Sequence, residues 1–557
     1  MSAAAFGPWS LLVGSASGRE REYLSLTTSR RLLAGRVSPE WPDSAGDAEG
    51  AGPTIASVAL IAVLFVVAAA MLAPGLAVGP SLDASVFSDV ASRMLHGVTP
   101  YVGAWDHKPP GIYLVTAGAQ ATLGWLGPWT AEWLLSLAVS VGIGISVAAG
   151  LARLGVTGWP RSLAAIGATI LASHYLLALG GGLTEPPAAL LVGSAFVLAV
   201  RSTGGARLAG IGLLVGLSAL VSVQLLPGGL IVLALALSQT TPGKRLRGTG
   251  LLALGFAAPL AGVAAWLLAI GAMPAALDAI VTYAGAYRSS GNEDGATLAA
   301  SVVAWTILTA LFLVAPALLG AVSPASRLPA RRASLYAVLL WIAATLLAII
   351  LQGRFYAHYA IALAVPLGVL AGLGLHRVGE SLRRAARPTA RAVIALPFVA
   401  TLLISVVAGV VSGAMQVALV ADGSSRMEAV SERLRDLPPG TMLVWGNEPR
   451  LYSLADRVPA TRYSYLYPLT TPRYSTAAQI DAVVQALAAH PPAVVVDVGS
   501  TAPGQPGFLP LLIDRPIASE GRDLDLLEPL RAFVAAHYRL EAIVSGWPIY
   551  LLREPQP

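Results

Sequence analysis

The sequence contains no cysteine and little charge. Disulfide bonds, thiol catalysis and cysteine-ligated zinc sites are therefore excluded. Only 12% of its 557 residues are charged, whereas soluble domains usually carry about 25%. The mean hydropathy is +0.69, and 55% of the residues are hydrophobic. A chain this long and this apolar is predicted to be an integral membrane protein.

Lysine is scarce too, since Lys108 and Lys244 are the only two among 36 basic residues. The formal net charge is +6, but no basic stripe is interleaved with aromatic residues, so nucleic acid is not an expected partner. The first 50 residues are polar and lack the order of a signal peptide. We interpret residues 1–50 as a disordered cytoplasmic tail.

Apolar runs long enough to cross a bilayer recur between Thr54 and about Val417. They predict about eleven transmembrane helices within a membrane domain over residues 51–419. The predicted spans are 54–78, 130–152, 162–179, 186–201, 208–222, 226–239, 248–271, 297–322, 333–351, 357–375 and 392–417. The fold class is thus a polytopic α-helical membrane protein.

Loops rich in arginine and lysine alternate along the chain with loops that contain few of them. With the N-terminal tail in the cytoplasm, the outer loops contain only Arg93, Lys108, Arg288 and Arg354. The cytoplasmic loops contain Arg153, Arg161, Arg201, Arg207, Lys244, Arg245, Arg247, Arg327, Arg331, Arg332, Arg377, Arg383, Arg384, Arg387 and Arg391. The positive-inside rule therefore predicts a plasma-membrane protein with a cytoplasmic N-terminus and an extracytoplasmic C-terminus.

Two segments outside the spans are predicted to be structured. The first outer loop, 79–129, contains an amphipathic helix over 83–96 and an interfacial or re-entrant helix over 109–123. After Val417, residues 420–557 are predicted to form an extracytoplasmic α/β domain. Its expected helices are 424–436 and 477–489, and its expected strands are 441–445, 493–498 and a hairpin over 538–552.

Ionisable residues gather in the predicted outer loops, where they are candidates for function. The first outer loop supplies Asp83, Asp89, Asp106, His107 and Lys108, the next supplies Glu185, and a later one supplies Arg354, His358 and Tyr359. This set suits transfer of a sugar from a polyprenyl-phosphate donor. Cations stabilise the leaving phosphate, and one carboxylate removes the acceptor proton. The phosphate needs no general acid, so further carboxylates could hold a divalent metal such as Mg, Mn or Ca.

One stretch of the first outer loop resembles the signature of C-type (GT-C) membrane glycosyltransferases. It runs from Pro100-Tyr101 through Trp105-Asp106-His107-Lys108-Pro109-Pro110-Gly111. The resemblance is to the bacterial protein-mannosyltransferase and aminoarabinose-transferase-like group, glycosyltransferase families 39 and 83. Weaker resemblances are Thr184-Glu185, the segment 353–359, Trp445 to Pro449, and Ser464-Tyr465.

The resemblance implies roles for individual residues. Asp83 is implied to be the catalytic base, Lys108 and Arg354 to contact donor phosphate, and Glu185 to arrange metal or acceptor. Asp89 and Asp106 are further acidic candidates. Two departures stand out, because many relatives have Asp-Glu where this chain has Asp83-Ala84, and Lys-Gln where it has Val223-Gln224.

Simpler interpretations of these residues remain open. Asp83 could serve only as a helix N-cap, because aspartate is a usual residue at that position. Lys108 is long enough to snorkel to the interface, and Glu185 suits the first turn of a helix. The tyrosines over 463–474 are expected either to form an interface belt or to pack the C-terminal domain on the membrane part. For the whole chain, the sequence favours an inverting glycosyltransferase with a protein, glycan or lipid acceptor. The alternatives are a transporter or lipid flippase, and a scaffold for the C-terminal domain.

Overall fold

The computed structural model describes residues 55–200, 204–289, 295–322, 329–353, 356–385, 387–421, 426–499 and 525–553. The predicted tail, residues 1–50, and the candidate Arg354 lie outside these residues. Contacts divide the chain into two units, Met1–Val58 and Ala59–Pro557. Everything described below, apart from the first turn of the first helix, belongs to the second unit.

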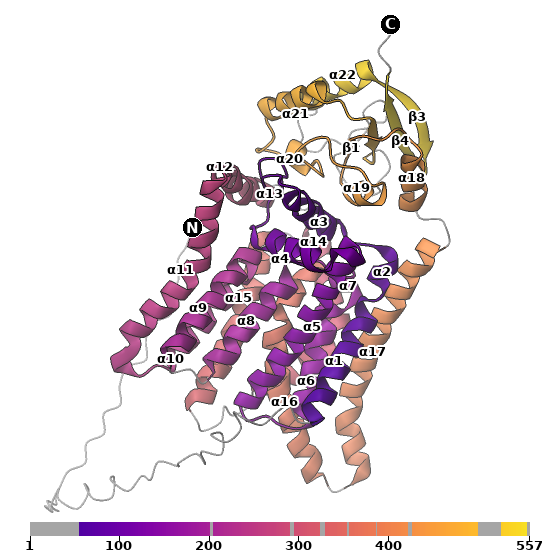
Figure 1. Ribbon diagram of the computed structural model, residues 1–557. Helices are drawn as coiled ribbons and strands as arrows, with labels where there is room; N and C mark the ends of the chain where they lie inside the picture. The colour runs from indigo at the N-terminus through magenta and orange to yellow at the C-terminus, as the bar shows by residue number, and fades with distance from the viewer. Residues whose placement is uncertain are drawn as a thin grey trace, which may run out of the picture. The chain divides into compact units, whose positions relative to one another are not determined.

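Helices dominate the chain up to Ala421 (Figure 1). In order they are α1 (Ile55–Leu72), α2 (Pro74–Val78), α3 (Leu82–Leu95), α4 (Gly111–Leu123), α5 (Pro128–Arg153), α6 (Trp159–Ser173), α7 (Tyr175–Ala178), α8 (Glu185–Ala199), α9 (Gly205–Val221), α10 (Leu226–Ser238), α11 (Arg245–Ala269), α12 (Met273–Leu277), α13 (Ala284–Ser289), α14 (Gly295–Ala321), α15 (Pro329–Gln352), α16 (Ala364–Arg384) and α17 (Pro388–Ala421). Short 3₁₀ segments η2 (Val223–Leu225), η3 (Pro242–Lys244) and η5 (Ala357–Leu363), and a π-helix, η4 (Asp278–Tyr283), connect some of them.

Each of the eleven predicted spans coincides with a helix or a pair of consecutive helices. Six segments of the described chain are long and apolar enough to cross a membrane: Ile55–Val78, Pro128–Arg153, Pro242–Ala269, Arg332–Gln352, Ala357–Arg384 and Ala395–Ala421. Helices α8, α9 and α10 are apolar but shorter, with 13 to 17 residues. The chain therefore has the helices of a polytopic membrane protein, and the number eleven stays a prediction.

Glycine allows close approach between bundle helices, as between α9 and α11. A Cβ on Gly255 would lie 2.1 Å from the Ala209 carbonyl oxygen, and one on Gly212 would lie 2.2 Å from the Leu252 carbonyl oxygen. Any larger residue would separate the two backbones. Small residues at such crossings are the usual basis of helix packing in lipid, where the hydrophobic effect does not bring helices together.

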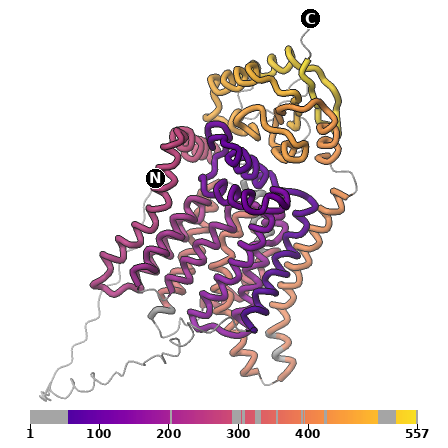
Figure 2. The backbone as a smooth tube through the Cα atoms, in the orientation of Figure 1, coloured from indigo at the N-terminus to yellow at the C-terminus, as the bar shows by residue number. Residues whose placement is uncertain are grey.

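The two helices expected in the first outer loop are both present. Helix α3 covers most of the predicted segment 83–96, and α4 begins just after the paired prolines Pro109 and Pro110. Glu132 of α5 holds both helices in place, since its Oε1 accepts from Ser88 Oγ at 2.7 Å and from Gln120 Nε2 at 2.8 Å. Figure 2 traces this part of the chain in indigo and purple, beside the C-terminal elements.

The C-terminal region, residues 426–499 and 525–553, contains the predicted α/β elements. Strands β1 (Met442–Trp445) and β2 (Val494–Asp497) pair in parallel, and the hairpin β3 (Tyr538–Val544) and β4 (Trp547–Leu552) adds to β2 in the order β1-β2-β4-β3. The accompanying helices are α18 (Arg426–Arg435), α19 (Arg450–Leu454), α20 (Tyr467–Thr470), α21 (Ala477–Ala489) and α22 (Glu528–His537). β1 and β2 are fully buried, which explains why β1 is wholly apolar and β2 is apolar up to its last residue, Asp497.

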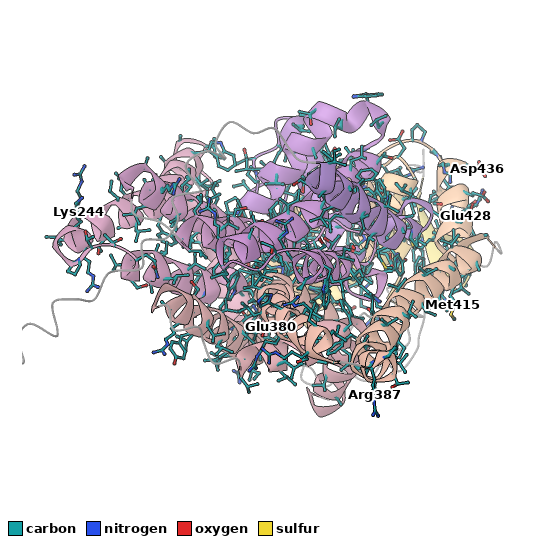
Figure 3. All side chains as sticks on the ribbon, turned by 90° about the horizontal axis from the view of Figure 1, so that it is seen from below. Lys244, Glu380, Arg387, Met415, Glu428 and Asp436 are labelled. Carbon is teal, nitrogen blue, oxygen red and sulfur yellow. The ribbon has the colours of Figure 1, made fainter. Side chains whose placement is uncertain are left out.

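Basic side chains mark one end of the helices. Lys244 lies between α10 and α11, and Arg387 lies just before α17. Both point away from the helices at the edge of the view in Figure 3. Helices α15 and α16 carry their basic residues at the same end as each other, because α15 begins near Arg332 and α16 ends at Arg384.

Candidate functional site

A cavity of about 630 Å³ lies where the first outer loop, the ends of several bundle helices and the C-terminal region meet. Seven of the predicted site residues line it: Asp83, Asp106, His107, Lys108, Glu185, His358 and Tyr359. Asp89 does not line it. Residues that are more than 350 positions apart in the sequence, such as Asp83 and Tyr465, therefore line the same cavity.

Asp83 occupies the first turn of α3, and it is not the N-cap. The cap is Ser81, whose Oγ accepts from the Ala84 backbone N–H at 3.2 Å. The interpretation of Asp83 as the helix cap is therefore wrong, because the helix begins two residues earlier than that interpretation requires. With the capping role taken by Ser81, the Asp83 carboxylate is available to the cavity that it lines.

Two tyrosine hydroxyls fix the main chain at Lys108. Tyr101 donates to the Lys108 carbonyl oxygen at 2.8 Å, and Tyr113 accepts from the Lys108 backbone N–H at 3.1 Å. Tyr101 itself is in the left-handed region, with φ of 65°. This loop is therefore held in a single shape by side chains rather than by regular structure, and Lys108 enters the cavity from a rigid base.

The Lys108 ammonium group is surrounded by acidic residues without being paired to one. Burial alone would lower the pKa of Lys108, but Tyr359, Asp83 and Glu185 act against burial and hold the pKa above its usual value. No carboxylate oxygen of the described residues lies within 4.0 Å of the Lys108 nitrogen. A charged ammonium group thus faces a space that an anion can enter.

Asp106 is buried and its carboxylate is fully hydrogen-bonded. Tyr113 donates to Oδ2 at 2.6 Å, Tyr465 donates to Oδ1 at 2.7 Å, and His107 Nδ1 lies 3.1 Å from Oδ1. Burial raises the pKa of Asp106, but the charge of His107 and these hydrogen bonds outweigh burial and leave the pKa below its usual value. Asp106 is therefore ionised, and its oxygens are occupied by protein donors.

Glu185 begins α8 and is only 2% exposed. Its carboxylate accepts from Thr184 Oγ1 at 3.0 Å. The position at a helix N-terminus stabilises a negative charge, as the sequence suggests, and the same side chain lines the cavity. Glu185 is thus both a first-turn residue of α8 and a lining residue of the cavity.

Asp89 lies away from the cavity, at the junction of α3 with the C-terminal region. Its Oδ2 is 3.5 Å from Arg93 Nη1, and Arg93 also donates to the carbonyl oxygens of Gly103 and Thr461. Burial raises the pKa of Asp89, and Arg93 opposes this only in part. Its position supports a role in joining the two parts of the chain.

Aromatic rings form much of the remaining wall. His358 stacks on Tyr356 at 5.5 Å and meets Tyr359 edge to face at 4.8 Å. The π-helix η4 turns Tyr283 toward the cavity, and Tyr287 follows one turn later. π-helical insertions of this kind are frequent at functional sites.

The sequence pointed less clearly to Gln224, Arg288 and Tyr465, which also line the cavity. Gln224 is 6% exposed, and its amide nitrogen has no hydrogen-bond partner within the described chain. Arg288 had appeared only as one of a few outer-loop cations. For the tyrosines over 463–474 the sequence leaves open an interface belt or packing of the C-terminal domain. Tyr463, Tyr465 and Tyr474 pack around Trp105 of the first outer loop.

The predicted divalent metal has a poor fit to these residues. In the part of the chain that the structure describes, no group of three or more His, Asp or Glu side chains could hold a metal ion. Asp106 has no free oxygen to offer, and Asp89 lies outside the cavity. The described lining residues therefore do not make up a metal site.

The packing around Ala84 explains why a second carboxylate is missing after Asp83. Ala84 is fully buried, and a Cβ on Gly182 would lie 2.6 Å from the Ala84 Cβ. Gly182 has a φ of +77°, so the glycine-rich turn that begins at Gly180 approaches α3 as closely as the backbone permits. A glutamate at position 84 has no room beside this turn.

Comparison with solved structures places this arrangement in a known fold. The structure is similar to ArnT from Cupriavidus metallidurans bound to undecaprenyl phosphate, with a TM-score of 0.53 and 15% identity over 90% of this chain and 99% of that one. The apo form of the same ArnT gives a TM-score of 0.50 at 15% identity, with the same coverage. The chain has a GT-C-type fold.

A more distant similarity is to the Archaeoglobus fulgidus oligosaccharyltransferase tethered to an acceptor peptide. Its TM-score is 0.47 at 14% identity, over 79% of this chain and 68% of that one. No protein-family model matches the chain, and no curated protein matches its sequence. The similarity to ArnT, at 15% identity, establishes the GT-C-type fold alone.

Replacing Ala84 tests whether the turn at Gly182 excludes a second acid. We expect Ala84→Glu to destabilise the protein by more than about 2 kcal/mol, because it both overpacks the contact and buries a carboxylate. Unfolding of the purified protein by denaturant in mixed micelles measures this. His96→Glu, at the exposed end of the same helix, is the control and should have little effect; an Ala84→Glu protein of normal stability would contradict the packing argument.

The Asp106 network gives a pH-dependent prediction. Asp106→Asn should cost about 1–3 kcal/mol at neutral pH, since it leaves buried hydroxyl donors without an anionic acceptor. Because the folded pKa of Asp106 is depressed, its stabilisation is complete above the unfolded pKa of about 3.9 and is lost as the pH falls through the lower folded value.

The difference in stability between wild type and Asp106→Asn should therefore narrow only below about pH 4. Unfolding midpoints measured from pH 7 to pH 3 check this. The exposed Asp481→Asn on α21 serves as control. A difference that is already gone at pH 6 would show that Asp106 is not ionised in the folded protein.

Proposed function

We propose that this protein is a membrane glycosyltransferase that moves a sugar from a polyprenyl-phosphate donor to an extracytoplasmic acceptor, with inversion at the anomeric carbon. One observation carries the proposal. The Lys108 ammonium group, which forms no ion pair within the described chain, shares a cavity with the carboxylates of Asp83 and Glu185, at the end of a bundle of apolar helices. The GT-C-type fold supports it, and the ArnT structure named above holds undecaprenyl phosphate.

The charges at the two ends of the helices support an extracytoplasmic cavity. Helix α15 has Arg332 near its start and ends at Gln352, which lines the cavity. The segment after it runs from His358, also in the lining, to Arg384. The basic ends are therefore opposite to the cavity. Under the positive-inside rule those ends face the cytoplasm, so the cavity opens on the outer side.

The donor phosphate is assigned to Lys108, with Arg288 and Gln224 as further contacts. Lys108 supplies a fixed positive charge, and charge-assisted hydrogen bonds to phosphate are the stronger kind. Gln224 brings a buried amide N–H group that lacks a protein partner within the described chain. Val223-Gln224 occupies the position where many proteins of the group it resembles have Lys-Gln. The amide of that pair is therefore present here, and the lysine is not.

Asp83 is assigned as the general base. It accepts the proton of the acceptor hydroxyl as that oxygen forms a bond to the anomeric carbon. The bond from the anomeric carbon to the phosphate oxygen breaks at the same time, and the electron pair leaves with the polyprenyl phosphate. Lys108 stabilises the charge on the departing phosphate, so no general acid is needed.

Glu185 and Asp106 have supporting assignments. Glu185, near Lys108, helps to position the acceptor. Asp106 holds the loop from His107 to Lys108 in place through its hydrogen bonds to Tyr113 and Tyr465. Arg354 stays a candidate phosphate contact from the sequence alone.

A transporter is the alternative function, and the distribution of buried charge favours the enzyme. A transport path needs charged or polar groups at several depths of the membrane. In the described helical bundle, the buried carboxylates are Glu132, the fifth residue of α5, and Glu185, the first residue of α8. Both therefore lie near the helix ends that face the first outer loop and its cavity.

Replacement of the base should abolish transfer. We expect Asp83→Asn to lower the rate of sugar transfer by at least about 100-fold, within the usual contribution of a general base. Transfer from undecaprenyl-phosphate-linked hexoses and pentoses, assayed in proteoliposomes, measures this. Asp436→Asn, on the exposed surface of the C-terminal region (Figure 3), is the matched control. A fully active Asp83→Asn protein would remove Asp83 from the mechanism.

The two lysines provide a matched pair for the donor site. We expect Lys108→Met to reduce kcat/KM for the lipid-phosphate donor by about 10- to 100-fold, because one charge-assisted contact is worth about 1.5–3 kcal/mol. Lys244→Met, at the opposite end of the bundle, should retain wild-type kinetics. Equal effects of the two substitutions would show that Lys108 acts only through the general charge of the protein.

A further inference from the structure

The cavity wall is divided by chemistry between two parts of the chain. Among the residues that the structure describes, its charged and imidazole lining groups all come from positions before α17, namely Asp83, Asp106, His107, Lys108, Glu185, Arg288 and His358. The C-terminal region contributes three lining residues, Asn447, Tyr465 and Tyr467, and none of them is charged. The part of the wall made by these three residues is called the neutral wall below.

The aromatic part of the neutral wall is held rigidly. The Tyr465 hydroxyl is committed to Asp106, and its ring lies 5.9 Å from Trp105. The Tyr467 ring meets Tyr465 edge to face at 6.0 Å, and it is only half-buried. The backbone N–H of Trp105 donates to the Arg462 carbonyl oxygen at 2.8 Å, which ties this loop to the first outer loop. The aromatic faces are thus in place before a ligand arrives.

Asn447 adds an amide at the end of β1. It follows Gly446, whose φ of +130° turns the chain out of the strand. The nearest charges in sequence, Glu448 and Arg450, pair with each other through two hydrogen bonds of 2.7 and 2.9 Å. The local charges therefore cancel, and the neutral wall offers an amide donor and acceptor beside tyrosine rings.

We propose that the neutral wall is an acceptor subsite for carbohydrate, which rests on the proposed function. Sugar rings present flat C–H faces that lie against aromatic rings and hydroxyl groups that pair with amides, and the neutral wall supplies both. An anionic lipid acceptor requires cations, and the C-terminal region contributes none to the lining. Binding of an extended peptide by strand addition needs a free strand edge, and no residue of β1–β4 lines the cavity.

Binding to the purified full-length protein in detergent tests this assignment. Saturation-transfer NMR would compare soluble tetrasaccharides of hexoses and pentoses with a hexapeptide rich in serine and threonine. A thermal shift with undecaprenyl phosphate reports on the donor site separately. We expect the wild-type protein to bind at least one tetrasaccharide and not the peptide.

Variants of Tyr467 and Asn447 locate the binding. Tyr467→Ala and Asn447→Ala should each weaken tetrasaccharide binding about tenfold, with the thermal shift by undecaprenyl phosphate unchanged. Tyr467→Phe keeps the ring and should retain binding, which separates loss of the ring from misfolding. Tyr336→Ala, an exposed tyrosine on α15, is the matched control.

The outcomes separate the two proposals. Binding of the peptide but of no tetrasaccharide, or equal loss of tetrasaccharide and undecaprenyl phosphate binding in Tyr467→Ala, would overturn the carbohydrate subsite. Absence of any undecaprenyl phosphate effect on the wild-type protein would instead count against the proposed function, whatever the tetrasaccharides do.

Discussion

The arrangement of the cavity depends on the buried carboxylate of Asp106. It accepts hydrogen bonds from Tyr113 of α4 and from Tyr465 of the C-terminal region, and it lies beside His107. Three separate parts of the chain therefore meet at one negative charge. A buried charge is stable only when it is paired or fully hydrogen-bonded, so the same contacts that keep Asp106 ionised also fix the loop that carries Lys108.

This network separates two kinds of acid within one outer loop. Asp106 has its oxygens occupied and serves the structure, whereas Asp83 has its capping role taken over by Ser81 and faces the cavity. Asp89 is a third kind, paired with Arg93 where α3 meets the C-terminal region. Acidic residues that look alike in the sequence thus differ in what their oxygens contact, and this difference supports the role of base that we propose for Asp83.

The absence of a second carboxylate after Asp83 also has a structural reason. Ala84 packs against the turn at Gly182, and the two positions are linked because neither tolerates a larger side chain. Similarly, α4 begins with Gly111, where a Cβ would lie 2.5 Å from the Leu220 carbonyl oxygen at the end of α9. The first outer loop is therefore shaped as much by small residues as by its charged ones.

Much of this architecture could be predicted from the sequence, because it follows from local patterns. Apolar runs indicated the bundle helices, and alternation of strand and helix signals indicated the elements of the C-terminal region. Clustering of ionisable residues in outer loops brought Asp83, Lys108 and Glu185 together correctly in one cavity. These features depend on which residues lie near each other along the chain, and hydrophobic periodicity therefore predicts them.

Only the tertiary structure decided the contacts between distant segments. Tyr465 reaches Asp106 across 359 positions, and the turn at Gly182 meets Ala84 across almost one hundred. The position of Asp89 outside the cavity and the neutral wall from Asn447 to Tyr467 depend on such contacts as well. No periodic pattern encodes them, because hydrogen bonding and close packing depend on distance in space and not on separation along the chain.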